Sequence, residues 1–202
     1  MEDMAEPSYR RLDVDERRRQ LIERGAELFT SHPYDELSMS RIAAEVGISK
    51  SLLYHYFPSK QAFFEATLGA WAEELRTRTE PDPDLPPAEQ LAASLGAFLA
   101  LIEENSVAYR NLMSSATSAP QIRGLIDQVR RQTATRILAG IYPDDPPPKA
   151  RAAVSGWLWF MDGACLDWIE HRDIDRDELR DLLLGTLMGA LVASGSPPDL
   201  GS

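Results

Sequence analysis

The chain has 202 residues, enough for one or two compact domains with a real core, and 44% of its residues are apolar. Its net charge of −11 argues against nonspecific binding of nucleic acid by the whole surface. The acidity is uneven, because residues 1–60 carry a net charge of −2 and residues 61–202 carry −9. Any binding of nucleic acid is therefore expected at a small face within the first part of the chain.

Cysteine content and hydropathy bear on where the protein works. The single cysteine, Cys165, cannot form an internal disulfide, so a reducing compartment is compatible with the sequence. No basic-then-apolar signal segment opens the chain, and the longest apolar run, Leu182 to Ala193, is too short to span a bilayer. These features predict a soluble, cytoplasmic protein with no membrane partner.

The N-terminal residues predict an arm and a first long helix. Residues 1–12 are expected to form a disordered arm, and Asp13 and Glu16 are spaced as a capping pair for the helix that follows. The basic run 17–19 either touches a DNA backbone or balances nearby acids on a solvated surface. His32-Pro33 ends the helix. Its predicted buried stripe is Leu21, Ile22, Gly25, Leu28 and Phe29.

The next stretch, from Ser38 to Lys60, reads as two short helices joined by a tight turn and followed by the start of a third. Ser38 is the candidate N-cap of the first helix, and Gly47 stands where a helix end needs a left-handed residue. Ser49 is the next candidate N-cap, preceded by an apolar residue with staple spacing to Leu53. Helix, glycine turn and helix within about 20 residues predict a helix-turn-helix motif.

The second helix of this motif, Lys50 to Tyr56, has no acidic residue although the chain is strongly acidic. Leu53 is expected to point inward, which leaves lysine, hydroxyl and aromatic side chains outside, where they suit phosphates and base edges. Lys60 begins the following helix, where the macrodipole disfavours a cation, and a DNA phosphate would explain its presence. A plain helical hairpin with ordinary surface charges is the alternative.

The motif resembles the DNA-binding module of the tetracycline-repressor (TetR) family through the pattern S-M-S-x-I-A-x-x-V-G-I-S-K-S-x-L-Y-x-Y-F-P-S-K. This resemblance implies that Lys50, Ser51 and His55 face bases and that Tyr54 reaches a base or a phosphate. It implies that Ser40 approaches a base edge. It also implies phosphate contacts for four further residues: Ser38, Met39, Tyr56 and Lys60.

Two positions depart from the family pattern. Ser51 stands where many members have glycine, and Leu52 stands where many have a small or hydroxyl residue. Leu52 is therefore expected to touch a thymine methyl group instead of donating a hydrogen bond.

A single rigid helix of about 20 residues is predicted from Lys60 onward, and it would connect DNA contacts to whatever packs on its far end. The polar segment 79–87 then forms a stiff linker, because no helix can cross its prolines. Three more helices are expected up to a second proline-rich break at 142–148. The predicted domains are residues 1–58, with the helix-turn-helix, and residues 59–202.

The last two predicted helices are apolar on nearly every side over Ala152 to Leu166 and Leu182 to Ala193. Such helices are buried all round, and glycines let backbones approach closely. They predict either a homodimer interface that forms a four-helix bundle across a two-fold axis or the central core of one protomer. The resemblance favours the dimer; its candidate residues are Gly156, Gly163, Leu182, Gly185, Thr186 and Gly189.

No catalytic or metal site is predicted. The three histidines are scattered, and no metal-binding spacing, phosphate loop or nucleophile motif is present. The sequence therefore predicts no enzyme activity, no metal and no cofactor. Cys165 is interpreted as a buried small hydrophobe and not as a redox sensor.

A small-molecule pocket is predicted in the second domain, since pockets are mostly apolar with a few placed polar groups. Asp162 is the most notable candidate, because a carboxylate in an apolar helix needs a partner. That partner is either an arginine such as Arg110 or Arg123, or a bound cationic or hydroxylated ligand. Asn105 and Thr133 are further polar candidates. The predicted lining is Phe64, Leu68, Trp71, Phe98, Ile102, Tyr109, Met113, Ile126, Trp157, Phe160, Met161 and Asp162.

Together these features predict an all-α fold of about nine helices, with an N-terminal helix-turn-helix domain and a C-terminal ligand-binding and dimerisation domain. The predicted function is a homodimeric transcriptional regulator, a repressor that leaves a pseudo-palindromic operator in double-stranded DNA when a small apolar ligand binds. Two alternatives remain at this point: a helical protein whose helix-turn-helix binds a protein partner, and a DNA-binding regulator without an effector.

Overall fold

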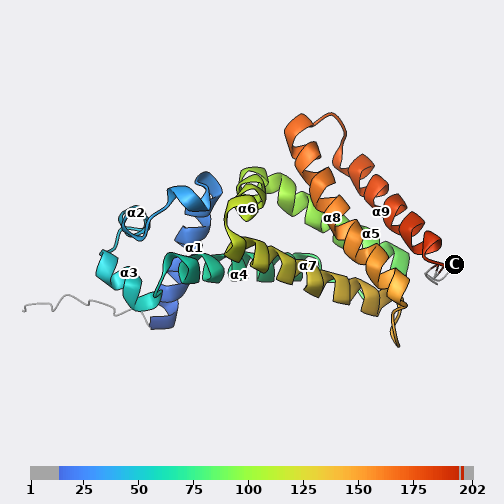
Figure 1. Ribbon diagram of the computed structural model, residues 1–202, viewed down its shortest axis with the longest axis horizontal. Coiled ribbons are helices and arrows are strands. Elements are labelled where there is room, and N and C mark those ends of the chain that lie inside the picture. Colours follow the sequence, from blue (N-terminus) through green and yellow to red (C-terminus); the bar gives the residue numbers. More distant parts are fainter. Residues whose placement is uncertain (1–13, 196, 198–202) are drawn as a thin grey trace, which may run out of the picture.

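The computed structural model shown in Figure 1 describes residues 14–195 and residue 197. Within these residues the chain forms nine α-helices and one short 3-10 helix, with no strand, so the prediction of an all-α fold is confirmed. Helices α1 to α3 lie at one end of an elongated molecule, and α8 and α9 lie toward the other. The arm predicted over residues 1–12 and the cap predicted at Asp13 lie outside the described residues.

The N-terminal end, here called the head, is a small helical unit with its own core. It consists of α1 (Val14–Ser31), the 3-10 turn η1 (Tyr34–Glu36), α2 (Met39–Glu45), α3 (Lys50–Tyr56) and the start of α4 (Lys60–Arg78). Phe63 of α4 is fully buried among side chains from α1 to α3. Helix α4 is therefore shared by the two predicted domains, because its first turns complete the core of the head.

The predicted caps explain where the short helices of the head begin and end. The hydroxyl oxygens of Ser38 and Ser49, the two predicted N-caps, accept hydrogen bonds from the backbone N–H three residues on, both at 3.2 Å. Ser59, which was not predicted as a cap, begins α4 in the same way at 3.0 Å. Gly47 has a φ of 75°, the left-handed conformation that ends α2 and turns the chain toward α3. The helix-turn-helix is thus formed as its local sequence predicts.

The remainder, here called the body, consists of the far part of α4 and five longer helices: α5 (Pro87–Glu104), α6 (Ser106–Ser118), α7 (Pro120–Ile141), α8 (Pro148–His171) and α9 (Arg176–Ala193). A proline occupies the first turn of α5, α7 and α8, where the missing N–H costs nothing. The two proline-rich segments therefore act as helix starts as well as breaks.

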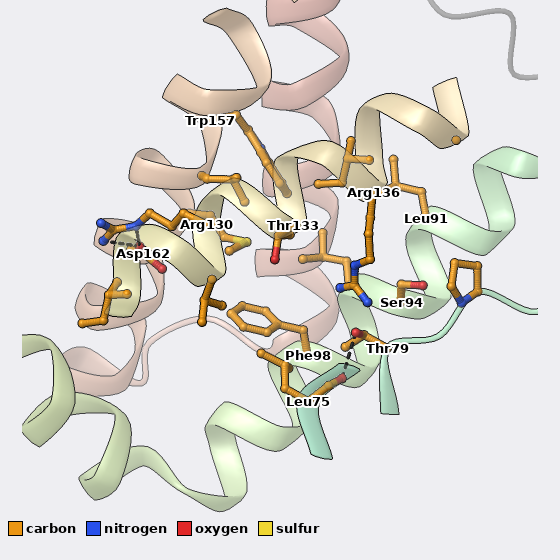
Figure 2. A pocket seen from close by; sticks show the side chains of 18 of the residues that line it. Leu75, Thr79, Leu91, Ser94, Phe98, Arg130, Thr133, Arg136, Trp157 and Asp162 are labelled. Atoms are coloured by element: carbon orange, nitrogen blue, oxygen red, sulfur yellow. Dashed lines mark hydrogen bonds and ion pairs between the residues drawn. The ribbon is translucent and has the colours of Figure 1, made fainter. Parts of the chain in front are cut away.

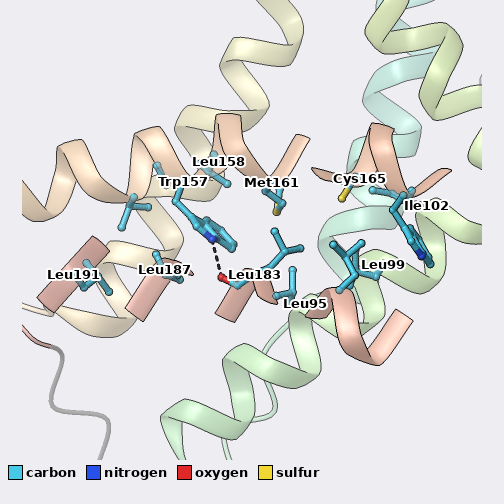
Figure 3. Close-up of a cluster of buried hydrophobic side chains, with 14 of the residues drawn as sticks. Leu95, Leu99, Ile102, Trp157, Leu158, Met161, Cys165, Leu183, Leu187 and Leu191 are labelled. Atoms are coloured by element: carbon cyan, nitrogen blue, oxygen red, sulfur yellow. Dashed lines mark hydrogen bonds between the residues drawn. The ribbon is translucent and has the colours of Figure 1, made fainter. Parts of the chain in front are cut away.

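The main core lies where α5, α8 and α9 meet (Figure 3). The indole Nε1 of Trp157 donates a hydrogen bond to the Leu183 carbonyl at 2.9 Å, which ties α8 to α9. Both helices are longer than their apolar stretches, and within one protomer one face of each remains exposed. Large apolar side chains on that exposed surface include Trp159 (59% exposed), Phe160, Leu182 and Val192.

Close packing of α1 holds the head together and joins it to the body. A Cβ added at Gly25 of α1 would lie 2.5 Å from Cζ of Phe63, so only glycine fits at this crossing of α1 and α4. Further along, the Asn111 side-chain amide of α6 donates to the Thr30 carbonyl of α1 at 3.0 Å. A movement of α4 or α6 would therefore displace α1 and change the position of the head.

Among the described residues no single helix is both long enough and apolar enough to cross a bilayer; α5 and α6 meet that test only as a pair, across a bend of 91°.

Candidate functional site

The exposed face of α3 carries the side chains predicted to read bases. Leu53 is fully buried and fixes the helix on the core of the head, while Lys50, Ser51, Tyr54 and His55 are exposed. We call these four residues the reading face. The Lys50 ammonium lies 6.0 Å from the Tyr54 ring centroid. The structure thus brings the four predicted base contacts together on one surface without an acidic neighbour in α3.

The predicted phosphate contacts are placed less uniformly. Ser38 and Ser40 are exposed, whereas Leu52 and Tyr56 are half-buried. Met39 is only 7% exposed and belongs to the core of the head. A contact from the Met39 side chain to a phosphate is therefore ruled out, and only its backbone N–H at the start of α2 remains available.

Lys60 has a partner inside the protein, which corrects the reason predicted for its position. Its ammonium donates a hydrogen bond to the Tyr34 carbonyl at 3.0 Å and lies 3.9 Å from the centroid of the Tyr34 ring. These contacts offset the unfavourable helix dipole without any phosphate. A phosphate contact from Lys60 therefore stays a prediction that no longer follows from its position alone.

The basic run of α1 keeps both of its predicted interpretations. Arg18 places its guanidinium carbon 5.2 Å from the ring centroid of Phe57, beside the end of α3, whereas Arg17 is half-buried and Arg19 is exposed. Arg18 is thus the member of the run that the fold fixes next to the helix-turn-helix.

A cavity of about 220 Å³ opens inside the body, between α4, α5, α6, α7 and α8 (Figure 2). Its wall is mostly aliphatic and aromatic. Nine of the twelve predicted lining residues meet in it: Leu68, Trp71, Phe98, Tyr109, Met113, Ile126, Trp157, Met161 and Asp162. Thr133, predicted as a polar candidate, lines it as well.

Three predicted lining residues lie elsewhere. Ile102 is fully buried in the main core, where it packs with side chains of α8 and α9 and does not line the cavity. Phe160 points outward from α8 and is 44% exposed, whereas Trp157 and Met161, four residues apart, share the face of α8 that lines the cavity. Phe64 lines a second cavity, of about 250 Å³, between α1, α4 and α6, which also takes in Asn105.

Asp162 is satisfied by residues of the chain itself, at one end of the first cavity. Arg130 of α7 donates to its carboxylate through Nε at 2.7 Å and Nη2 at 2.6 Å, and the Tyr109 hydroxyl donates to its other oxygen at 2.9 Å. Asp127 holds the remaining guanidinium nitrogen at 2.8 Å. We call these four residues the Asp162 cluster.

This cluster corrects the predicted partners of Asp162. Arg110 instead donates to the Ile169 carbonyl at 3.4 Å, and Arg123 donates to the Ala116 carbonyl at 3.2 Å. Arg130 was missed because the sequence does not show which arginine of α7 faces α8 in the folded chain. With its oxygens already paired, Asp162 offers little to the cationic ligand that the sequence left open.

Burial governs the ionisation of this end of the cavity. Burial raises the pKa of the Asp162 carboxyl, and the Arg130 guanidinium and the Tyr109 hydroxyl oppose that rise. The pKa of Tyr109 is raised well above its ordinary value, first by burial and then by the nearby carboxylate. Burial also raises the pKa of Cys165 to about 12, so this thiol is protonated and packs as an apolar group.

The opposite end of the cavity carries polar residues that the sequence analysis missed. Arg136 of α7 and Ser94 of α5 both line the wall there, near Thr79 at the end of α4 (Figure 2). The spacing along α7 could have predicted Arg136, because it follows the predicted Thr133 by three residues and so shares its face of the helix.

The glycines and apolar residues predicted to pair two protomers lie on the outer faces of α8 and α9. A Cβ added at Gly156, Gly163, Gly185 or Gly189 would meet no atom within 4 Å, so nothing in this protomer requires glycine there. Leu182 is 48% exposed and Thr186 is half-buried beside it. These residues form one accessible surface on two neighbouring helices.

No group of three or more metal-ligating side chains occurs within the described part of the chain.

Two family models match most of the chain. Residues 21–67 match "Bacterial regulatory proteins, tetR family", and residues 87–190 match "Tetracyclin repressor-like, C-terminal domain". The transcriptional activator FasR of Mycolicibacterium smegmatis is 28% identical over 178 residues, which is 83% of this chain and 79% of that protein. A tetR-family regulator from Streptomyces coelicolor superimposes with a TM-score of 0.79 at 30% identity, covering 91% of this chain and 84% of the other.

Two further solved structures share the fold and hold small molecules. A regulator from Saccharomonospora viridis in complex with choline has a TM-score of 0.67 at 20% identity and covers 84% of this chain and 94% of its own. FadR from Bacillus subtilis in complex with stearoyl-CoA has a TM-score of 0.62 at 19% identity, with 85% and 98% covered. These two likenesses concern the fold alone.

Proposed function

The chain belongs to the tetR family of bacterial regulatory proteins, and from that premise we propose a homodimeric repressor that leaves its operator when a small apolar ligand binds. As a member of this family it is a DNA-binding transcriptional regulator and not an enzyme. The observation that carries the proposal is the reading face: four exposed polar side chains and no acid, on a helix fixed by a fully buried leucine.

In this proposal the reading face of each protomer enters a major groove. Lys50, Ser51 and His55 read base edges, while Tyr54 and the amides at the start of α2 fix the register on the phosphates. The acidic remainder of the protein keeps the rest of its surface away from DNA. Recognition therefore depends on a small contact area and favours specificity.

A second copy of the chain is the proposed occupant of the outer faces of α8 and α9. Trp159, Phe160, Leu182 and Val192 expose large apolar side chains there, and open glycine positions between them let another pair of helices approach closely. The resulting four-helix bundle gives the assembly a two-fold axis. Two-fold symmetry then requires an operator with two half-sites separated by a whole number of turns of ~34 Å.

Helix α4 is the proposed link between ligand and DNA. Phe63 near its start is buried in the core of the head, whereas Leu68, Trp71 and Leu75 farther along line the cavity. A ligand that pushes on the far part of α4 therefore tilts the head and changes the spacing of the two reading faces. Near-complete release requires ~5.5 kcal/mol of difference in ligand affinity between the two conformations.

The test is selection of genomic fragments by the purified protein, followed by gel shifts of the selected DNA at two salt concentrations. We expect fragments that share one sequence with two-fold symmetry, and binding that weakens as salt increases. Fragments without a common sequence would overturn the proposal of specific reading. Transcription from a selected promoter, measured with and without the protein, shows whether the protein represses or activates. This matters because the relative FasR is named an activator.

Dimerisation has its own test by sedimentation of the full chain. We expect a two-protomer mass for the parent protein and a one-protomer mass for Leu182→Glu, since a buried like-charge pair across a two-fold axis is unfavourable. The control is Arg131→Glu on the exposed side of α7, which should sediment as the parent does. A parent protein that sediments as a monomer would remove the basis for a symmetric operator.

A further inference from the structure

The wall of the cavity in the body contains an unpaired arginine, in a protein that is acidic as a whole. Its carboxylate and guanidinium groups are Arg130, Arg136 and Asp162. Arg130 and Asp162 neutralise each other through two short contacts, at 2.7 and 2.6 Å. Arg136 is therefore the charged lining residue without an ion pair among the described residues, whereas Arg130 is shared between Asp162 and Asp127.

Arg136 has no hydrogen bond, ion pair or ring contact with any of the described residues. No acid lies three or four residues from it along α7, so its own helix supplies no partner. In Figure 2 its side chain points toward Ser94 and Thr79 at this end of the cavity, although the residue as a whole is exposed. The guanidinium is thus without a protein partner beside the apolar wall.

Ser94 supplies a second, independent observation at the same end. Its hydroxyl oxygen is buried and is the one buried side-chain polar atom without a hydrogen-bond partner in the described residues. Thr79 beside it differs, because its hydroxyl already donates to the Leu75 carbonyl at 2.8 Å. A buried donor without a partner destabilises the protein unless a ligand or a water molecule accepts a hydrogen bond from it.

We propose that this cavity binds an apolar molecule with a single anionic head group, and that Arg136 and Ser94 hold that head group. The body of the ligand then follows the apolar wall along α7 toward the Asp162 cluster. Arg136 and Arg130 are six residues apart, about 9 Å along the helix axis. This inference rests on the proposed function, because it names the chemical class of the effector for the same cavity.

Charge also excludes the opposite class. A cationic head group at one end of the cavity would meet Arg136, and at the other end it would find Asp162 already bonded by Arg130 and Tyr109. A neutral apolar molecule would fill the cavity but would leave both Arg136 and Ser94 without partners. An anion can accept hydrogen bonds from both groups and also neutralise Arg136, and such charge-assisted hydrogen bonds are roughly twice as strong as neutral ones.

The test compares four probes that share one alkyl chain: decanoate, decyl phosphate, decanol and decyltrimethylammonium. Binding to the full-length protein is followed by tryptophan fluorescence, since Trp71 and Trp157 both line the cavity. We expect at least one of the two anions to bind tenfold or more tightly than decanol, and the cation to bind more weakly than decanol. The stronger anion identifies the head group. Equal affinity for decanol and both anions, or tighter binding of the cation, would overturn the proposal.

The variant Arg136→Gln identifies the group responsible. We expect it to weaken binding of the preferred anion at least tenfold while decanol binding changes less than twofold, and Arg136→Lys to restore part of the loss. Ser94→Ala should weaken the anion by a smaller factor. The matched control is Arg131→Gln, which lies on the same helix, is exposed and does not line the cavity. Equal losses for anion and alcohol in Arg136→Gln would show that Arg136 acts on the fold and not on the head group.

The outcomes for the two proposals can be told apart by adding each probe to the protein–DNA complex. An anion that binds through Arg136 without weakening DNA binding would leave this inference standing and contradict release by the ligand. Release of DNA by decanol, together with no Arg136-dependent binding of either anion, would contradict this inference and leave the regulator intact.

Discussion

The head and the body treat their polar side chains in opposite ways. On the reading face Lys50, Tyr54 and His55 point away from the protein, and their hydrogen-bonding groups are left to the solvent. In the body the Asp162 cluster pairs a buried carboxylate with a guanidinium and a phenol. The head therefore holds polar groups ready for an outside partner, and the body holds polar groups that keep the helices together.

Arg136 is the exception that makes this difference informative. It lines the same cavity as Arg130 and comes from the same helix, but only Arg130 is paired. Arg130 is thus paired inside the protein, like the other polar groups of the body. Arg136 has no protein partner, like the side chains of the reading face. Polar groups left without partners mark the places where this molecule is equipped to bind something else.

The largest expected effect comes from Arg130→Met, which removes the partner of a buried carboxylate. We expect a loss of roughly 3–5 kcal/mol in the free energy of unfolding, since breaking one side of a buried pair leaves an uncompensated charge. Urea denaturation measures it. The control Arg123→Met removes an exposed arginine that bonds only to backbone carbonyls, and should change stability little. Equal losses in both variants would show that the Asp162 cluster is not what stabilises the body.

The same variant has a pH dependence with a definite sign. Burial raises the pKa of Asp162 above its unfolded value, so the folded state takes up this proton more readily and stability increases as pH falls through the folded pKa. Arg130 opposes that rise, and its removal should raise the pKa further. The deficit of Arg130→Met against the parent should therefore be smaller at about pH 5 than at neutral pH. A deficit that grows on acidification would contradict the assignment.

Reversing a charge on the reading face comes next in size. Lys50→Glu should weaken binding to a selected operator fragment by about a hundredfold, about 3 kcal/mol, because it removes a base contact and adds repulsion from phosphates. Lys149→Glu, which changes an exposed lysine at the start of α8, should leave affinity nearly unchanged. Gel shifts measure both, and circular dichroism checks the fold. An equal loss in the two variants would mean that net charge, and not the reading face, controls binding.

The crossing of α1 and α4 inside the head gives a smaller effect. Gly25→Ala would place a methyl group 2.5 Å from Cζ of the fully buried Phe63, so we expect a loss of about 1–3 kcal/mol in the free energy of unfolding. Gly69→Ala on α4 is the matched control, since its Cβ would meet nothing within 4 Å and should stabilise the helix by about 0.5–1 kcal/mol. Thermal unfolding of the two variants should shift in opposite directions.

The smallest expected effect concerns Lys60, which the structure ties to Tyr34. If Lys60 also contacts a phosphate, Lys60→Ala should weaken binding to all sequences alike and lower the slope of log affinity against log salt by about one. The variant's free energy of unfolding must be measured alongside, because the contact with Tyr34 is lost too. An unchanged slope together with lower stability would assign Lys60 to the fold of the head alone.

The sequence predicted the head well because local rules decide its shape. Ser38 and Ser49 cap the next helices through their own hydroxyls, and Gly47 adopts the left-handed conformation that its place in the turn requires. Lys60 shows the limit of such rules. Its contact with Tyr34, 26 residues earlier in the chain, exists only because η1 folds back against the start of α4.

In the body, the sequence alone determined which residues are apolar, where prolines start new helices, and that Asp162 needs a partner. Tertiary structure alone decided that the partner is Arg130, that Phe160 faces outward, and that Arg136 and Ser94 line the same cavity. The physical reason is that a helical pattern fixes which face of a helix is buried, but not which other helix covers it. Pairing between side chains far apart in the chain depends on how the helices cross, and that is set by the packing of the whole core.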